Sequence, residues 1–276
     1  MQIRYVQMEG AGNRILVVDE RRHRRAPPSP DAIRALGDTA TGPGFDQLMW
    51  VLPAASAGAV ASYRVFNRDG SEVEQCGNGV RCVARLLADA GDAPAAFWLE
   101  SPAGPVEARI TAPGRVAVDM GVPEFNPEKI PFVAEREANF YDLDVNGQTF
   151  KIGAVSMGNP HCVLDVDDVS GADVASLGPR LERHHRFPAR TNVGFMARRT
   201  RDEIDLRVFE RGVGETLACG TGACAAVAVG RRRGELDANV RVNLPGGQLV
   251  VSWPRSVDRV WLTGNAEPLR EGIIDL

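Results

Sequence analysis

Short apolar runs separated by turn residues recur along the chain and predict a fold built mostly from β-strands. The runs RILVVDE (14–20), QLMWVL (47–52) and SYRVFN (62–67) are rich in β-branched and aromatic residues. The Asp69-Gly70 pair after the third run predicts a turn. The segment FWLESPAGPVEARI (97–110) has the pattern of a hairpin, with a strand on each side of a Pro-Ala-Gly-Pro turn.

Two segments with helical periodicity interrupt the strands. Residues 78–90, NGVRCVARLLADA, predict a helix that ends at Gly91. Residues 220–233, GTGACAAVAVGRRR, are apolar on nearly every face, so we expect a buried helix with arginines in its last turn, where the helix dipole favours cations. Shorter amphipathic stretches with Ser29 and Ser170 near their starts predict two surface helices.

The chain contains an internal repeat. Sliding it by 143 residues places Cys76 on Cys219, YRVFNR (63–68) on LRVFER (206–211), and the hairpin segment from Pro102 on the one from Pro245. With small insertions, GNRILVVD from Gly12 matches GNPHCVLD from Gly158, and DQL from Asp46 matches TNV from Thr191. Three matches in the same order predict one architecture made twice.

The predicted fold class is α/β, of the α+β type, with two pseudo-symmetric halves. Each half is a strand-rich, barrel-like sheet wrapped around a central buried helix. We expect a first half at 1–120, to which the tail 265–276 returns, and a second half at 121–264. Residues 121–147, rich in Pro, Glu and Asn, are expected to form the joint. The active site is expected in the cleft between the halves.

Composition and charge argue against membrane, nucleic-acid-binding and metal-binding classes of protein. The chain has 276 residues, 44% of them hydrophobic, but no apolar run near the roughly 20 residues that span a bilayer. Together with an amino-terminal segment unlike a signal peptide, this predicts a cytoplasmic protein that binds no membrane. A formal charge of −4 gives no broad attraction to nucleic acid, and the basic, proline-terminated run at 21–30 is expected to be a solvated loop. Five cysteines without ligand spacing predict thiols and no metal site.

Two of these thiols stand where a helix begins. Cys76 and Cys219 each follow a strand and precede Gly-x-Gly, where unpaired N–H groups and the helix dipole are expected to lower the thiol pKa. The same N–H groups would bind a carboxylate. Cys82, Cys162 and Cys224 are expected to be small buried hydrophobes.

A thiol on each half suits a reaction that removes a proton from one face of a carbon and returns one to the other face. Such a reaction is a racemisation or epimerisation. The repeat breaks its symmetry where Asn67 is replaced by Glu210, whereas Arg68 and Arg211 match. Arg211 can hold a carboxylate and Glu210 can accept from an ammonium group.

Other polar residues are candidates for the same site. Asn13, Asn159 and Asn192 lie at predicted turns, where each is either a turn former or a ligand for a zwitterion. His161 lies in a repeated turn and is a candidate site residue. The remaining histidines, His23, His184 and His185, lie in charged segments and are expected at the surface.

The motifs EQCGNGVRC (74–82), MGNPH (157–161), FERGVGET (209–216) and ACGTGACA (218–225) together resemble diaminopimelate epimerase. The resemblance covers essentially the whole chain. It implies an isomerase, independent of pyridoxal phosphate and metal, that interconverts LL- and meso-2,6-diaminopimelate in bacterial lysine and peptidoglycan-precursor biosynthesis.

The resemblance also implies a set of site residues and a homodimer. Cys76 and Cys219 are the implied acid/base thiols, assisted by His161 and Glu210. The implied substrate contacts are Asn13, Gln47, Asn67, Gly77, Asn78, Asn159, Asn192, Glu210, Arg211, Gly220 and Thr221.

Two places depart from the family pattern. Arg14 and Ile15 stand where the family usually has Asp-Phe, and Arg270 stands where a tyrosine often makes the dimer contact.

Three other functions compete with this one. A proline or hydroxyproline racemase would also use two cysteines, but it has no second amino-acid end to occupy Glu210 and Arg211. A redox switch between Cys76 and Cys219 would not explain the glycines. A phosphate-binding module is disfavoured because the chain has neither a P-loop Lys-Ser pair nor a dinucleotide fingerprint.

Overall fold

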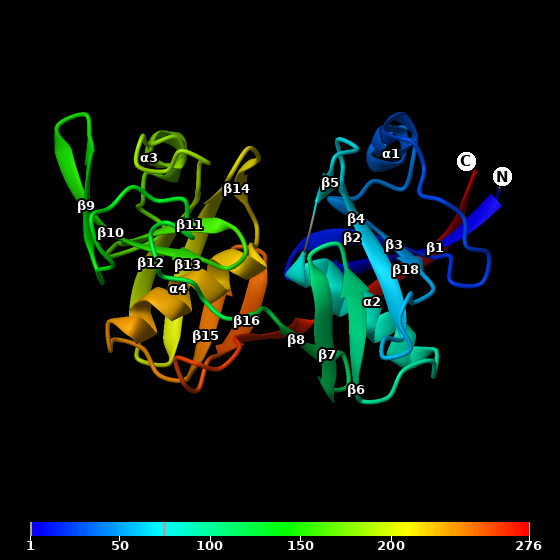
Figure 1. Ribbon diagram of the computed structural model, residues 1–276. Coiled ribbons are helices and arrows are strands. Elements are labelled where there is room, and N and C mark those ends of the chain that lie inside the picture. Colours follow the sequence, from blue (N-terminus) through cyan, green and yellow to red (C-terminus); the bar gives the residue numbers. More distant parts are fainter. Residues whose placement is uncertain (1, 74–75, 276) are drawn as a thin grey trace. The chain divides into compact units, whose positions relative to one another are not determined.

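The structure is a computed structural model that describes residues 2–73 and 76–275, so the first two residues of the EQCGNGVRC motif lie outside it. The chain divides into two compact units (Figure 1). Unit 1 comprises Met1–Asp119 and Thr263–Leu276, and unit 2 comprises Met120–Leu262. The chain passes from unit 2 to unit 1 within strand β17 (Trp261–Asn265).

Unit 1 is a curved mixed sheet. Its strands are β1 (Gln2–Gly10), β2 (Asn13–Asp19), β3 (Gln47–Leu52), β4 (Ala61–Asn67), β5 (Glu72–Val73), β6 (Ala96–Ser101), β7 (Gly104–Ala112), β8 (Arg115–Asp119) and β18 (Glu267–Asp275). They pair in the order β18-β1-β2-β3-β4-β6-β7-β8, and β2–β3 and β4–β6 are the parallel pairs. The predicted strands and the 97–110 hairpin are therefore confirmed.

Helix α2 (Gly77–Asp89) is the centre of unit 1. It contacts β1, β2 and β3 as well as β7 and β8, so the two ends of the sheet curl around the same helix. Val80, Val83 and Leu87 are fully buried on it, as their spacing requires. The helix begins and ends one residue earlier than predicted, and Gly91 follows it with a left-handed φ of 74°.

Unit 2 repeats this connectivity. Its strands are β9 (Tyr141–Val145), β10 (Gln148–Ser156), β11 (Pro160–Asp165), β12 (Asn192–Thr200), β13 (Glu203–Glu210), β14 (Gly214–Thr216), β15 (Asn239–Leu244) and β16 (Gly247–Ser252). They pair in the order β9-β10-β11-β12-β13-β15-β16, with β11–β12 and β13–β15 parallel. Helix α4 (Gly220–Arg232) packs on β10, β11, β12, β13 and β16 and is buried along most of its length.

The strand register matches between the two units. In unit 1 Ile15, two residues after Asn13, pairs with Gln47. In unit 2 His161, two residues after Asn159, pairs with Asn192. The sequence repeat therefore corresponds to a structural repeat, and the two predicted halves with a central helix are confirmed.

Each unit has one surface helix in the connection between two parallel strands, β2 and β3 in unit 1 and β11 and β12 in unit 2. Helix α1 (Pro30–Gly37) begins after Ser29 as predicted, and the Ser29 hydroxyl accepts from the Ala32 N–H at 3.3 Å. Helix α3 (Val174–Glu182) begins later than predicted. Its N-cap is Asp173, which accepts from the Ser176 N–H at 3.1 Å.

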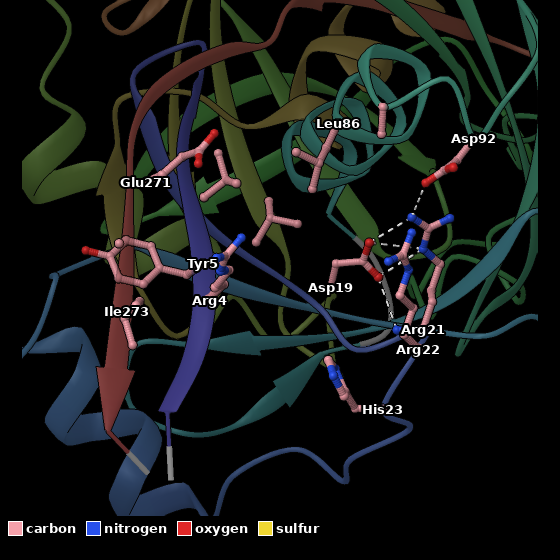
Figure 2. A pocket seen from close by; sticks show the side chains of 14 residues that line it. Arg4, Tyr5, Asp19, Arg21, Arg22, His23, Leu86, Asp92, Glu271 and Ile273 are labelled. Atoms are coloured by element: carbon pink, nitrogen blue, oxygen red, sulfur yellow. Dashed lines mark hydrogen bonds and ion pairs between the residues drawn. The ribbon is translucent and has the colours of Figure 1, made fainter.

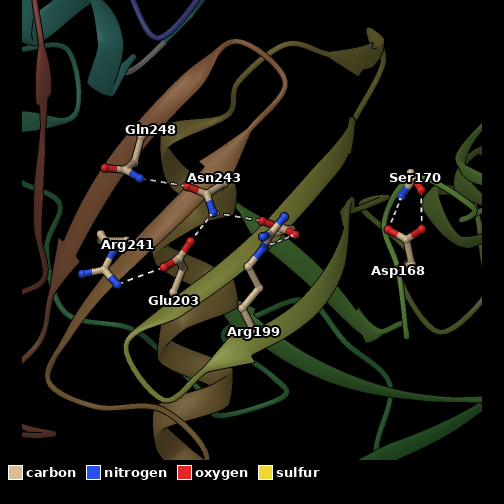
Figure 3. A network of polar contacts seen from close by, with 8 residues as sticks. Asp168, Ser170, Arg199, Glu203, Arg241, Asn243 and Gln248 are labelled. Carbon is tan, nitrogen blue, oxygen red and sulfur yellow. Dashed lines mark hydrogen bonds and ion pairs between the residues drawn. The ribbon is translucent and has the colours of Figure 1, made fainter.

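Ser170 is not a helix cap. It turns back on Asp168 through its backbone N–H at 2.9 Å and through its hydroxyl, as Figure 3 shows. Its side chain takes part in a local turn hydrogen bond.

A polar network fixes how β13 pairs with β15 (Figure 3). The Asn243 amide donates to Glu203 and to Asp205, each at 2.9 Å, and Arg241 donates to Glu203 at 2.9 Å. The Gln248 amide on β16 donates to Asn243 Oδ1 at 2.9 Å. Because β13 ends at Glu210, this network fixes the strand that carries a candidate site residue.

The segment 121–147 is part of unit 2, so the expectation that it forms a joint is wrong. Ile130, Phe132 and Tyr141 belong to the core of unit 2, and Phe132 packs on the rings of Tyr141 and Phe187 with centroids 4.7 and 4.6 Å apart. Burial of these apolar side chains outweighs the loop-like composition around them.

Within the described residues, no helix is both long and apolar enough to cross a membrane.

Candidate active site

Cys76 and Cys219 occupy equivalent places in the two units. Each is the N-cap of a central helix, with extended φ and ψ. The Cys76 sulfur accepts from the Gly79 N–H at 3.3 Å, and the Cys219 sulfur accepts from the Gly222 N–H at 3.4 Å. Both sulfurs therefore replace the oxygen that usually caps a helix, and both lie at its positive end.

The second glycine of each motif lies in close contact with a neighbouring side chain. A Cβ on Gly79 would lie 2.4 Å from the Met49 sulfur. A Cβ on Gly222 would lie 3.0 Å from Val208 Cγ2 and 3.3 Å from the Cys219 sulfur. These glycines therefore let the helix lie close to a strand and leave space for the thiol, rather than only opening backbone N–H groups to a ligand.

The polar candidates of unit 1 lie at the ends of adjacent strands. Asn13 begins β2, Gln47 begins β3 and Asn67 ends β4, where Gln47 and Asn67 are paired in register. The Gln47 amide donates to the Asn67 carbonyl oxygen at 3.1 Å. Gln47 Oε1 is buried and accepts no hydrogen bond from the described residues. This amide oxygen is thus available to a donor from a ligand.

Asn78 is the exception among these candidates. Its side chain is buried and accepts from the fully buried Arg81 guanidinium at 2.9 Å, while Arg81 also donates to the Gly77 carbonyl at 3.4 Å. The side chain therefore stabilises the first turn of α2. What Asn78 can offer a ligand is its backbone N–H.

In unit 2 a chain of contacts connects a histidine to the thiol. His161 Nε2 lies 2.9 Å from Asn159 Oδ1, and the Asn159 amide donates to the Thr221 hydroxyl at 3.5 Å. Thr221 Oγ1 lies 3.5 Å from the Cys219 sulfur. Because Asn159 Oδ1 can only accept, Nε2 carries the imidazole proton.

His161 is neutral in this structure. It is buried within β11, between β10 and β12, and this burial, followed by the charge of Arg211, lowers its pKa to about 3. The ring therefore positions Asn159 and cannot serve as a cationic acid near neutral pH.

Glu210 lies beside Cys219, and each alters the other. Burial raises the Glu210 pKa, although hydrogen bonds from Thr216, at 2.5 Å, and Cys219 oppose the rise. Burial, followed by the Glu210 charge, raises the Cys219 pKa well above its ordinary value. The expectation that a helix start lowers this thiol's pKa is wrong for Cys219. The Gly222 N–H and Thr221 hydroxyl do favour the thiolate, but desolvation outweighs them.

Asn192 and Arg211 meet at the turn that follows β13. Asn192 Oδ1 accepts from the Arg211 N–H at 3.0 Å, and its amide donates to the Pro160 carbonyl at 3.1 Å. The exposed Arg211 guanidinium donates to the Ala189 carbonyl at 3.0 Å. Asn159, Glu210 and Thr221 thus lie around the start of α4, which Gly220 begins, whereas Asn192 and Arg211 contact each other at the turn after β13. Thr216, which fixes the Glu210 carboxylate, lies inside the FERGVGET motif but sequence reasoning missed it.

The remaining cysteines and histidines are outside this arrangement. Cys82, Cys162 and Cys224 are fully buried, as predicted, and burial raises the Cys82 pKa to about 12. His184 was expected at the surface, but it is buried and its Nε2 lies 3.1 Å from the Asp144 carbonyl oxygen. That backbone partner is remote in sequence, so charge pattern gave no sign of it.

A hollow of about 800 Å³ in unit 1 lies away from the thiol (Figure 2). It is lined by β1, β2, β18 and the C-terminal end of α2, whereas Cys76 caps the other end of the helix. Figure 2 shows Arg21 between Asp19 and Asp92. Arg21 Nη2 lies 2.7 Å from Asp19 Oδ2 and 2.6 Å from Asp92 Oδ2. These ion pairs fix the first residue of the basic run 21–30, for which a solvated loop is predicted, whereas Arg22 and His23 are exposed.

Comparison with known proteins identifies the family. The family model described as diaminopimelate epimerase matches residues 5–126 and 153–268. The chain belongs to the diaminopimelate epimerase family. It is therefore an isomerase of the epimerase kind, and the resemblance inferred from the motifs is confirmed.

Curated relatives cover the full chain. The diaminopimelate epimerase of Halorhodospira halophila is 52% identical over 275 residues, which cover 99% of this chain and 96% of the relative. That of Alkalilimnicola ehrlichii is 50% identical over 279 residues and all of both chains.

Solved structures share the fold at low identity. A hydroxyproline epimerase from Agrobacterium vitis is 15% identical with a TM-score of 0.71, and covers 99% of this chain and 92% of that one. A PhzF-family phenazine biosynthesis protein from Bacillus anthracis is 17% identical with a TM-score of 0.72, over all of both chains.

The departures from the diaminopimelate epimerase pattern are part of unit 1. Ile15 is fully buried in β2, and the Arg14 N–H donates to Asp46 at 2.8 Å. Arg270 donates to Gln7 and to the Pro43 carbonyl, each at 2.7 Å. Arg14 and Arg270 line the same small hollow, so both departures belong to one surface.

Proposed function

We propose that the protein interconverts LL- and meso-2,6-diaminopimelate by a two-cysteine acid/base reaction, in bacterial lysine and peptidoglycan-precursor biosynthesis. The observation that carries the proposal is the repeated capping thiol. Cys76 and Cys219 lie at equivalent helix starts in a member of this family, and the polar side chains of Thr221 and Glu210 lie beside Cys219.

The reaction divides its protons between the two thiols. One sulfur, as thiolate, takes the α-proton, and the electron pair of the broken C–H bond remains on the α-carbon. The other sulfur, as thiol, gives its proton to the opposite face, so the stereocentre inverts. Cys219, whose pKa burial and Glu210 raise, is suited to the thiol form at the start of a turnover. After turnover the protonation states of the two sulfurs are exchanged, and Glu210 assists the return.

The polar residues would bind the two amino-acid ends of the substrate. The N–H groups at the starts of α2 and α4, from Gly77, Asn78, Gly220 and Thr221, would hold the carboxylate at the reacting centre. Arg211 and Glu210 would hold the distant carboxylate and ammonium group, with Asn13, Gln47, Asn67, Asn159 and Asn192 completing the contacts.

Deuterium incorporation tests this reaction. The reduced protein is incubated with LL-diaminopimelate in deuterated water, and we expect one α-deuterium together with formation of the meso isomer. Cys76→Ala and Cys219→Ala should each abolish epimerisation while circular dichroism shows an unchanged fold. Cys82→Ala, which removes a buried thiol from α2, is the matched control. Substantial turnover by either single variant would exclude the two-base reaction.

The alternative is a proline or hydroxyproline racemase, because a hydroxyproline epimerase shares this fold. Proline has no second amino-acid end, so it would leave Arg211 and Glu210 without ligands. Turnover of proline and LL-diaminopimelate, measured side by side, distinguishes the two functions. Faster turnover of proline would support the racemase.

We also propose that the enzyme acts in the cytoplasm, as a homodimer and without pyridoxal phosphate or metal. The five thiols suit a reducing compartment. Strand β18 pairs along one side with β1, and its exposed Leu269 and Ile273 suit a contact with a second copy. Light scattering tests the dimer, and activity after dialysis against a chelator and a carbonyl reagent tests cofactor independence.

A further inference from the structure

Glu182, the last residue of α3, contacts the residues next to the candidate residues Asn192 and Arg211. Its backbone carbonyl accepts from the Thr191 N–H at 3.1 Å. Its side-chain Oε1 accepts from the Gly212 N–H at 2.8 Å. One residue therefore holds the position just before Asn192 and the position just after Arg211.

Local rules do not favour a carboxylate at this place. The last turn of a helix is the negative end of its dipole, where acidic side chains are unfavourable. The Glu182 side chain is also only 3% exposed, and burial penalises its charge. Arg183 Nε lies 3.3 Å from Oε2, and Arg190 lies 3.9 Å from Oε1, which offsets part of this cost. A buried carboxylate at the unfavourable end of a helix indicates that its contacts with the neighbouring candidate site are needed there.

The loop that leaves Glu182 also contacts Arg211. Residues 183–190 lead from Glu182 to Thr191, and within them the Ala189 carbonyl accepts from the Arg211 guanidinium at 3.0 Å. Asn192 accepts from the Arg211 backbone N–H. Both ends of Arg211 are therefore fixed by a segment that begins at Glu182.

Unit 1 braces the equivalent turn in a weaker form. There Arg34 of α1 donates to the Asp69 carbonyl at 2.9 Å, in an exposed contact just after Asn67 and Arg68. In both units the surface helix therefore supports an equivalent turn, which follows β4 in unit 1 and β13 in unit 2. Only unit 2 uses a buried charge, and only unit 2 has Glu210 and Arg211 in that turn.

We propose that Glu182 is a positioning residue that fixes the Glu210–Gly212 turn, so that Arg211 holds the carboxylate of the substrate's non-reacting end. This role rests on the function proposed above. Glu182 touches neither thiol in the described contacts, so its removal should weaken substrate binding more than it slows the proton transfers.

Three substitutions at Glu182 test the role. Glu182→Ala should raise KM for LL-diaminopimelate at least tenfold while kcat stays within about threefold of the wild type. Glu182→Gln keeps an oxygen that accepts from the Gly212 N–H and should hold KM within about threefold. Glu182→Asp keeps the charge but is too short, and should resemble Ala; it also serves if Glu182→Ala does not fold. Asp173→Ala, at the other end of α3, is the matched control and should leave KM unchanged.

Hydrogen exchange at the Gly212 amide gives a readout that needs no substrate. The amide should be protected in the wild type and in Glu182→Gln, and should exchange faster in Glu182→Ala. An unchanged KM in folded Glu182→Ala and Glu182→Asp, or an equal KM rise in Asp173→Ala, would overturn the positioning role. A wild-type protein inactive on diaminopimelate would instead overturn the proposed function, and with it this role.

Discussion

Gly222→Ala should slow catalysis through the Cys219 thiol, without a large loss of stability. The added Cβ would lie 3.0 Å from Val208 Cγ2, 3.2 Å from Cys219 Cβ and 3.3 Å from its sulfur. Val208 is β-branched and cannot rotate away freely, so the cysteine must move by a few tenths of an ångström. Overpacking costs about 1–3 kcal/mol, whereas alanine in a helix gains about 1 kcal/mol over glycine, so the net destabilisation is about 0–2 kcal/mol.

The expected effect on activity is larger. A misplacement of about 1 Å can cost roughly 100-fold in rate, so a shift of a few tenths of an ångström should lower kcat/KM by about 3- to 30-fold. Gly230→Ala, on the same helix, is the matched control, because its Cβ would meet Leu236 Cδ1 at 2.4 Å, far along the helix from the thiol.

Chemical denaturation and initial rates of epimerisation, measured on both variants, separate the two effects. Gly230→Ala should be destabilised at least as much as Gly222→Ala and keep kcat/KM within about twofold. Full activity in Gly222→Ala, or an equal loss in Gly230→Ala, would refute the reasoning.

Three further predictions concern unit 2. Arg211→Lys should lower kcat/KM for LL-diaminopimelate by about 10- to 150-fold. An ammonium group cannot replace a bidentate guanidinium, and a charge-assisted hydrogen bond contributes about 1.5–3 kcal/mol. The control is Arg199→Lys, in an exposed ion pair, which should have no measurable effect on kcat/KM. Thr216→Val removes a hydrogen bond that lowers the Glu210 pKa, so the acidic limb of the kcat/KM profile should move to higher pH, and an unmoved limb would count against an ionised Glu210. His161 has a native pKa of about 3, below that of an unfolded histidine, so between these values only the unfolded state binds the proton. The free energy of unfolding should therefore fall as pH drops from about 6.5 towards 3, by at most about 1.4 kcal/mol per pH unit from His161, and His161 should not affect it above about pH 6.5. In His161→Gln the free energy of unfolding should lack this contribution to its pH dependence. Identical pH dependence in the variant and the wild type would contradict a neutral, buried His161.

Local sequence determined much of this protein. Gly-rich starts and apolar periodicity specify α2 and α4 to within one residue, because caps and buried faces are encoded within a few residues of each other. The offset that places Cys76 on Cys219 also aligns YRVFNR with LRVFER and the two hairpin segments, and three matches in one order indicate a fold made twice. The motifs around these thiols were enough to indicate the family.

Tertiary structure decided what depends on burial and on partners far apart in the chain. Helix position predicts a lowered pKa for Cys219, but the opposite holds because the fold removes water from the sulfur and places Glu210 beside it. His184 has a charged sequence neighbourhood and is nevertheless buried against the Asp144 carbonyl. Glu182 carries no sequence signal at all. Its contact with Gly212 exists only because the end of α3 and the turn after β13 lie side by side in the folded chain. Desolvation of the carboxylate and the geometry of its hydrogen bond depend on both segments together, so neither segment alone predicts them.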